Sequence, residues 1–209
     1  KELDGLRAVA VIAVIINHFN GDLLPNGYLG VDIFFVISGY VITLSLVKRK
    51  SNNFSDYILG FYERRIKRIL PLLLIFIVST SILICMINAY PIFHLRTAFA
   101  SLFGLSNIYL FQISDGYFTA SSDLNPFTNT WSLSVEEQFY FVYPLLAWFS
   151  GYTRNKKNSS KYLSILLSVL GSISIILFIY YYPINQNAAY FLMPSRFWEI
   201  ALGCLAFIG

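Results

Sequence analysis

The stretch YLGVDIFFVISGYVITLSLV, residues 28–47, decides the fold class, because it is almost entirely apolar over the length of a membrane span. A helix needs about 20 such residues to cross the hydrocarbon core of a bilayer. Asp32 is the one charged residue within the stretch, and a basic cluster at 48–50 follows directly. The stretch therefore predicts a membrane-spanning helix whose C-terminal end lies on the cytoplasmic side.

The composition of the whole chain agrees with a membrane protein. Of its 209 residues, 56% are hydrophobic and 12% are charged, against about 25% charged residues in an average soluble domain. Lys and Arg concentrate in 48–68 and 154–161, which is typical of cytoplasmic loops, so no nucleic-acid partner is expected. Cys85 and Cys204 lie in apolar runs and are expected to be buried, and no metal site is expected.

Further apolar runs on both sides of 28–47 predict more spanning helices. Residues between Ser55 and Leu70 are polar and basic, and they predict an amphipathic helix on the membrane surface. Pro71 is expected to open the span that follows. The complete set of predicted crossings is 6–20, 28–47, 71–90, 132–150, 162–182 and a last helix from about 195 onward.

Segment 97–113 is apolar but short, and it leaves two topologies open. If it crossed the membrane, the basic loop 151–161 would lie outside, against the positive-inside rule. A re-entrant or interfacial segment keeps that loop inside and is the preferred interpretation. The predicted fold class is an all-α polytopic transmembrane helical bundle, with about six crossings and one re-entrant or interfacial segment.

Ionisable residues inside predicted spans mark the candidate site, because each costs about 2.5 kcal/mol or more at the centre of a span. Arg7 and His18 are eleven residues apart on one predicted helix. They therefore share a face and lie about 16 Å apart along the axis. Arg7 alone is explained equally well as an inner anchor, and His18 as an interfacial residue. Together they favour a polar path, in which His18 is suited to proton transfer.

Carboxylates in two other predicted spans could lie near His18. Asp32 either orients the imidazole of His18 or complements the helix dipole. Glu136 and Glu137 open the span 132–150. Because adjacent helical residues are about 100° apart, only one of these two can face a given point. That residue either faces His18 or serves only as a charge at a helix N-terminus.

Arg64, Arg65 and Arg68 are expected to form one basic face on the cytoplasmic side, because they are three or four residues apart. This face suits either anionic lipid or a phosphate-rich ligand from the cytoplasm. Arg196 and Glu199, three residues apart on the last predicted helix, are expected to pair.

The chain resembles the membrane domain of the bacterial acyltransferase 3 family, whose members O-acylate cell-surface polysaccharides. The matching segments occur in the family's order and cover nearly the whole sequence. They are LDGLRAVAVIAVIINHF, GYLGVDIFFVISGYVI, FYERRIKRILP, SNIYLF with a following GYF, NTWSLSVEEQFYFVYPLL and SRFWEIALG. The family domain is longer, so residues 1–209 are expected to be a partial membrane acyltransferase domain, truncated at its C-terminus.

The resemblance implies an integral-membrane acyltransferase that takes an acyl group, usually acetyl, from cytoplasmic acyl-CoA. The family's Arg-x10-His falls on Arg7 and His18, its Arg-x-x-Arg on Arg65 and Arg68, and its acidic residue on Glu136 in preference to Glu137. The acceptor is expected to be a hydroxyl of an extracytoplasmic glycan or lipid-linked saccharide.

The cellular location and the alternative functions can also be predicted. The resemblance implies a multi-pass protein of the bacterial cytoplasmic membrane, and acyl transfer by a base needs no metal. The alternative functions are a secondary transporter that uses the same intramembrane polar residues, and a membrane scaffold with lipid-anchoring charges.

Overall fold

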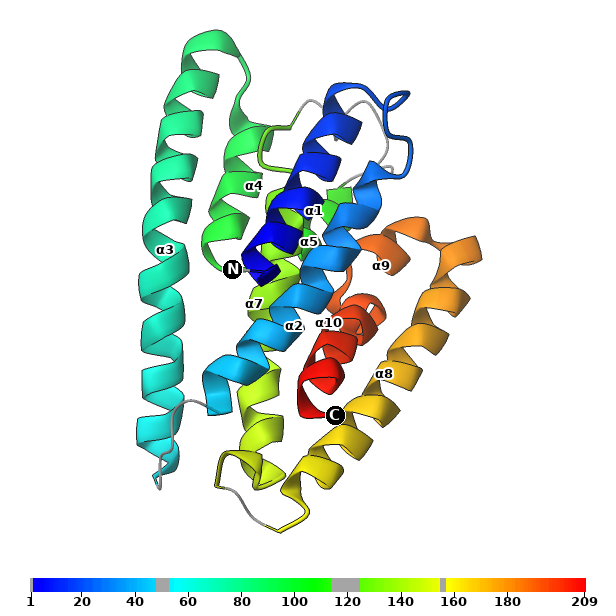
Figure 1. Ribbon diagram of the computed structural model, residues 1–209. Helices are drawn as coiled ribbons and strands as arrows, with labels where there is room; N and C mark the ends of the chain where they lie inside the picture. Colours follow the sequence, from blue (N-terminus) through cyan, green and yellow to red (C-terminus); the bar gives the residue numbers. More distant parts are fainter. Residues whose placement is uncertain (1, 48–52, 114–124, 155–156) are drawn as a thin grey trace.

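The structure is a computed structural model that describes residues 2–47, 53–113, 125–154 and 157–209. The basic cluster 48–50, the GYF segment at 116–118 and Lys156 lie outside these ranges. The described residues form helices and no strands, as the predicted all-α class requires (Figure 1). The elements are α1 (Glu2–Phe19), η1 (Gly27–Leu29), α2 (Gly30–Val47), α3 (Phe54–Ile87), α4 (Ile92–Leu102), α5 (Ser106–Ile113), α7 (Thr130–Phe149), η2 (Tyr152–Arg154), α8 (Ser159–Ile184), α9 (Gln186–Phe191) and α10 (Met193–Ile208).

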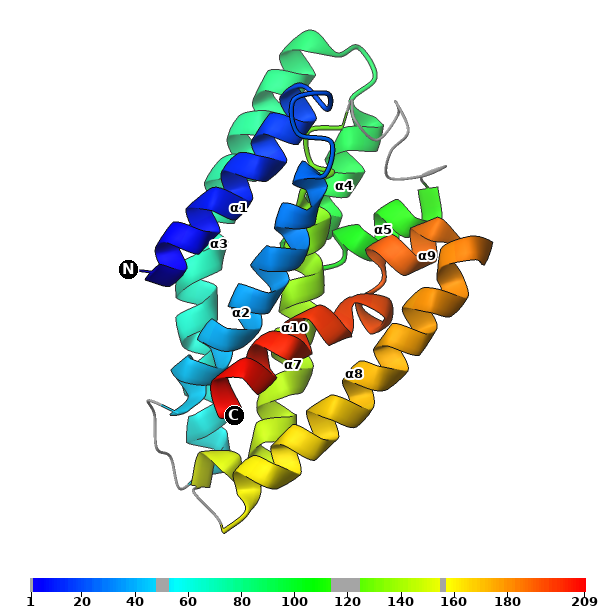
Figure 2. The same ribbon diagram turned by 45° about the vertical axis from the view of Figure 1, so that its right-hand side comes forward.

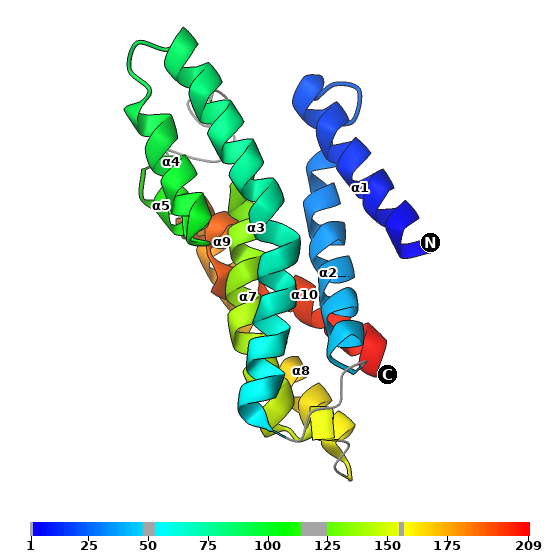
Figure 3. The same ribbon diagram turned by 90° about the vertical axis from the view of Figure 1, so that its left-hand side faces the viewer.

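The long helices run up and down beside one another, with α7 at the centre of the bundle (Figures 1 and 3). Trp131, Phe139 and Tyr143 of α7 are buried in the main hydrophobic core. Among the described residues, four segments are long and apolar enough to cross a membrane, which supports an α-helical membrane bundle. They are Gly27–Val47, Phe54–Ile87, Ser159–Ile184 and Gln186–Ile208.

Helices α1 and α7 are the other two predicted crossings, and they are less apolar than those four segments. Helix α1 carries Glu2, Asp4 and Arg7, and α7 carries Glu136 and Glu137. Both run alongside the apolar helices (Figure 1). The number of six crossings therefore stays a prediction.

Helix α3 differs from expectation, because it continues through Pro71 as one helix of 34 residues. The predicted division into a surface helix and a separate span was wrong. Proline removes one backbone hydrogen bond, but neighbouring groups and local adjustments make that loss tolerable in membrane helices. The basic residues before Pro71 are therefore part of the same helix as the apolar residues after it. Cys85, near the end of α3, is exposed, so the expected burial holds for Cys204 alone.

The apolar segment 97–113 is broken into parts of two helices, neither of which can cross a membrane. Helix α4 has 11 residues and α5 has 8, and the break falls at Gly104 with a φ of 65°. Glycine adopts this left-handed conformation without the steric cost that a Cβ would add. Helix α4 returns beside α3 and ends within the bundle (Figures 1 and 2). This arrangement agrees with the predicted re-entrant or interfacial segment.

Helices α2 and α10 cross in direct backbone contact, at Gly39 on α2 and Gly203 on α10 (Figure 2). A Cβ on Gly39 would collide with the carbonyl oxygen of Ile200, and one on Gly203 would collide with that of Val36. Small residues at such crossings let membrane helices approach closely. The two glycines therefore hold α10 against the helix that precedes the basic loop.

Replacing Gly39 by Ala is expected to destabilise the protein by about 2 kcal/mol or more, because the added methyl group meets backbone that cannot easily move. Gly5→Ala on α1 is the matched control, since a Cβ there meets nothing within 4 Å and Ala favours the helix by about 0.5–1 kcal/mol. Thermal unfolding in detergent should show a lower midpoint for Gly39→Ala and an unchanged or higher one for Gly5→Ala. Equal midpoints in the two variants would contradict the close crossing.

Candidate functional site

The candidate site centres on Glu136, a buried carboxylate in the middle of the bundle. Its side chain faces inward from α7, and the residue is 8% exposed. Oε1 accepts a hydrogen bond of 2.8 Å from the Ser38 hydroxyl on α2, and Oε2 accepts one of 2.7 Å from the Tyr140 hydroxyl. Both carboxylate oxygens are therefore fixed by donors. Ser38 was missed by the sequence analysis, because a serine in an apolar stretch gives no sign of its partner.

Two guanidinium groups from different helices act on this carboxylate. The guanidinium groups of Arg7 on α1 and Arg65 on α3 are both close enough for their charges to act on Glu136. The guanidinium of Arg65 lies 4.8 Å from the centre of the Tyr140 ring, within the range of a cation–π contact. We call Arg7, Ser38, Arg65, Glu136 and Tyr140 the carboxylate cluster. The cluster joins four helices. It contains Arg7 and Glu136, which were predicted to be catalytic, and Arg65, which was predicted to bind the acyl donor.

Arg7 is half-buried beside this carboxylate. Its guanidinium lies 5.5 Å from the centre of the Phe34 ring on α2. Its Nε is buried and has no hydrogen-bond partner among the described residues. A buried donor without an acceptor is costly, so this N–H is available to a ligand that supplies an oxygen.

Neither interpretation of Glu136, a contact with His18 or a charge at a helix N-terminus, agrees with the structure. Helix α7 begins at Thr130, so Glu136 lies six residues, or about 9 Å, inside the helix. The carboxylate therefore lies within electrostatic range of Arg7 and Arg65, while His18 lies at the far end of α1. Its neighbour Glu137 points elsewhere, toward Gly104 in the break between α4 and α5.

Asp32 lies in the first turn of α2, as the helix-dipole interpretation requires, and its partner is Arg196 and not His18. Its Oδ1 accepts from Arg196 Nη1 at 3.1 Å, and Arg196 also donates to Glu199 at 2.5 Å. The predicted pairing of Arg196 with Glu199 is confirmed. Asp32 and Arg196 are 164 positions apart, so no local spacing could have indicated their contact. Asp32 thus ties α2 to α10 instead of orienting His18.

His18 lies near the C-terminal end of α1, on an exposed part of the helix. Its Nδ1 is 2.9 Å from the carbonyl oxygen of Val14. A carbonyl oxygen can only accept, so this contact assigns the proton of a neutral ring to Nδ1. Nε2 then carries the lone pair and is the nitrogen able to accept a proton.

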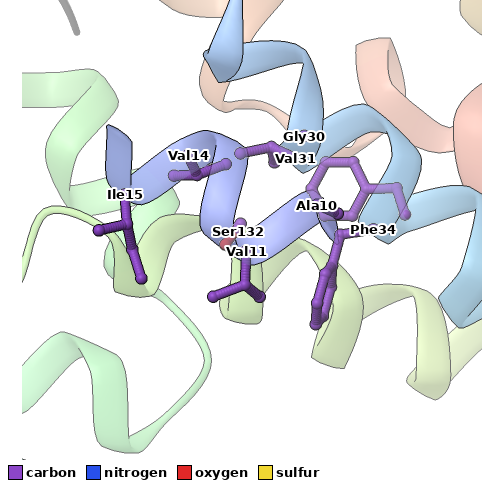
Figure 4. Close-up of a pocket in the computed structure, with 9 residues that line it drawn as sticks. Ala10, Val11, Val14, Ile15, Gly30, Val31, Phe34 and Ser132 are labelled. Carbon is purple, nitrogen blue, oxygen red and sulfur yellow. The ribbon is translucent and has the colours of Figure 1, made fainter. Parts of the chain in front are cut away.

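An apolar cleft of about 190 Å³ lies between α1, α2 and α7 (Figure 4). Ala10 and Val14 line it from α1, three and seven residues after Arg7, on the face that also carries His18. Phe34, the ring beside Arg7, lines it from α2, and Ser132 adds a hydroxyl from α7. The two polar ends of the α1 face are therefore separated by an apolar cleft, where the sequence analysis had predicted a polar path.

The three arginines of the predicted basic face on α3 do not all point in the same direction. Arg65 turns inward to Tyr140 and the Glu136 carboxylate, whereas Arg64 and Arg68 are exposed. Both exposed arginines are near enough for their charges to act on Arg65. The surface cations and the buried cluster are thus contiguous through one side chain. No group of three potential metal-ligating side chains occurs in the part of the chain that the structure describes.

The chain matches the model of a protein family described as "Acyltransferase domain" over residues 1–208. It is 36% identical to O-acetyltransferase OatA of Staphylococcus aureus (strain NCTC 8325 / PS 47), over 99% of this chain and 34% of that protein. It is 36% identical to peptidoglycan O-acetyltransferase OatA of Listeria monocytogenes over 99% of this chain and 33% of that protein. It is 32% identical to putative peptidoglycan O-acetyltransferase YrhL of Bacillus subtilis (strain 168), over 97% of this chain and 32% of that protein.

The chain thus spans about a third of the length of the curated relatives it matches. No solved structure matches it significantly.

Proposed function

Since the chain belongs to the acyltransferase domain family, we propose that it forms part of a multi-pass O-acetyltransferase of the bacterial cytoplasmic membrane. In this proposal an acetyl group passes from cytoplasmic acyl-CoA to a hydroxyl of a cell-wall polysaccharide on the other side. The relatives named as O-acetyltransferases support the acetyl group and the polysaccharide acceptor. The observation that carries the proposal is the α1 face, where Arg7 precedes and His18 follows the residues that line one apolar cleft.

The inner end of the route is the proposed binding site for the acyl donor. The exposed Arg64 and Arg68 suit the phosphates of CoA, because guanidinium groups bind phosphate through paired hydrogen bonds. Arg65 connects these two cations to the carboxylate cluster. Glu136 holds Arg65 and Arg7 at the inner end of the cleft, where the unpartnered Nε of Arg7 can donate to a carbonyl oxygen of the donor.

The cleft is the proposed path of the acyl group. Its apolar lining by Ala10, Val14 and Phe34 suits a thin, uncharged acyl-bearing arm better than a charged one. An arm in this cleft would point its thioester along α1 toward His18. The surrounding side chains would keep water away from the thioester, so that hydrolysis does not compete with transfer.

His18 is the proposed general base at the outer end. Its Nε2 accepts the proton of the acceptor hydroxyl as that oxygen attacks the thioester carbonyl carbon. The new ester bond forms, the carbon–sulfur bond breaks, and the proton passes from Nε2 to the departing thiolate. The step balances without any metal or redox partner.

The experiment that tests the function uses the full-length protein in membrane vesicles with acetyl-CoA labelled in its acetyl group. Labelled ester on wall polysaccharide, released by mild base, is the expected result. Transport of a solute without consumption of acetyl-CoA would favour the carrier alternative. Label that stays in acetyl-CoA under conditions where a relative is active would reject the proposal.

Arg68→Gln tests the donor site separately. We expect the KM for acyl-CoA to rise about tenfold with little change in kcat, because one charged hydrogen bond to phosphate contributes about 1.5–3 kcal/mol. Lys157→Gln, which removes an exposed charge near the start of α8, is the control and should leave KM unchanged. An equal rise in both variants would mean that general surface charge, and not a site, attracts the donor.

A further inference from the structure

Helix α4 presents an apolar stripe to its surroundings, with one cation in the middle of it. Ile92, Leu95 and Phe99 recur at helical spacing on one face, and Arg96 lies among them. Phe99 is 65% exposed, and Arg96 is exposed as well. The opposite face of α4 is buried against the bundle. The stripe is therefore a face of α4 that no described residue covers, and in an apolar setting its unmatched charge is costly.

This stripe lines a groove of about 390 Å³, to which α5 contributes Tyr109. The groove is almost wholly apolar apart from Arg96. Helix α4 forms no ion pair with any described residue, so the guanidinium of Arg96 has no anionic partner in the described part of the chain. An apolar groove with a single cation suits a molecule that combines an aliphatic chain with an anionic group.

We propose that this groove binds an anionic phospholipid, with its phosphate on Arg96 and an acyl chain along Leu95, Phe99 and Tyr109. Arg96 lies four residues after the first residue of α4, about 6 Å along the axis. A long arginine side chain can reach the headgroup level from that depth while its methylenes stay in the apolar layer. Guanidinium and phosphate form paired, charge-assisted hydrogen bonds, which the neutral chain of a detergent or a sterol cannot offer.

The other face of α4 connects this lipid site to the centre of the bundle. Thr97, next to Arg96, accepts a hydrogen bond of 2.9 Å from Asn125, and the hydroxyls of Ser101 and Thr130 are 2.6 Å apart. Thr130 is the first residue of α7. A lipid that fixes α4 therefore also fixes the beginning of the helix that carries Glu136. Bound lipid is thus expected to stabilise the fold measurably.

The test is thermal unfolding of the purified full-length protein in a neutral detergent, with phosphatidylglycerol or phosphatidylcholine added. Phosphatidylglycerol, added at a concentration well above its Kd, is expected to raise Tm by about 4 °C. Phosphatidylcholine at the same concentration is expected to raise Tm less. Arg96→Gln and Phe99→Ser should each remove the difference between the two lipids. Lys161→Gln, an exposed cation of α8, should keep it.

Three results would overturn the proposal. The first is an equal response of Arg96→Gln and the unaltered protein to phosphatidylglycerol. The second is an equal rise with both lipids, which would indicate general solvation of apolar surface. The third is a full rise with inorganic phosphate alone, which would indicate an anion site that needs no lipid chain. Because none of these measurements uses acyl transfer, the lipid site can fail while the proposed function stands.

Discussion

Replacing Glu136 by Gln is expected to lower kcat/KM for acetyl transfer by about 10²–10³-fold. The amide keeps the shape of the side chain, but its NH2 group cannot accept a hydrogen bond, so either Ser38 or Tyr140 loses its acceptor. A buried donor left without an acceptor costs about 1–3 kcal/mol, and more when a charged group is involved. The guanidinium groups of Arg7 and Arg65 would then lose the positions that the proposed donor site requires. Labelled-acetyl transfer in membranes, normalised to the amount of folded protein, measures the effect.

Glu137→Gln is the matched control for that experiment, since it makes the same chemical change one residue away. The side chain of Glu137 lies toward Gly104 and away from the carboxylate cluster. We expect the loss in Glu137→Gln to be at least tenfold smaller than in Glu136→Gln. Equal losses in the two variants would show that the negative charge of α7 as a whole, and not the position of Glu136, supports activity.

Replacing His18 by Ala is expected to lower kcat by about 10²–10⁴-fold, the usual contribution of a positioned general base. The fold should survive, because His18 is exposed and its ring contributes no core packing. Since Nε2 is the proposed base, His18→Gln should be as inactive as His18→Ala, although Gln can still hydrogen-bond. Added imidazole should restore part of the activity to His18→Ala if the cleft admits it.

The second histidine of the chain provides the control. The chain has two histidines, and His94 lies on α4 with its Nε2 3.2 Å from the amide nitrogen of Asn88. His94→Ala should retain activity within a few-fold of the unaltered protein. Activity that persists in His18→Ala, or that is lost equally in His94→Ala, would reject His18 as the base.

The fold class follows from sequence where a single physical preference dominates. The apolar run at 28–47 became η1 and α2, because twenty apolar residues have few alternatives to a helix in a membrane. The sequence also indicated that segment 97–113 does not form a full membrane crossing, because the segment is short and contains polar residues. The sequence did not indicate that α3 continues through Pro71. The continuity depends on whether the packing and hydrogen bonds of the whole helix outweigh the loss of one backbone hydrogen bond at the proline.

The partners of the site residues depended on tertiary contacts that spacing does not encode. The shared face of Arg7 and His18 followed from helical geometry alone. The placement of Arg7 within electrostatic range of Glu136 depends on how deep Glu136 lies in α7. The ion pair of Asp32 with Arg196 depends on the glycine crossing of α2 and α10. A charged residue in an apolar helix therefore marks a site well, but it does not identify which other charge it meets.

The sidedness of the reaction is the decisive test of whether the α1 face carries an acyl group from an inner donor site to an outer base. The full-length protein would be reconstituted in liposomes in one orientation, with acetyl-CoA on one side and a soluble wall glycan on either side. We expect acetylated glycan when donor and acceptor are on opposite sides, with donor on the side of Arg68, and no product in His18→Ala. Product formed only when donor and acceptor share a side would contradict this expectation.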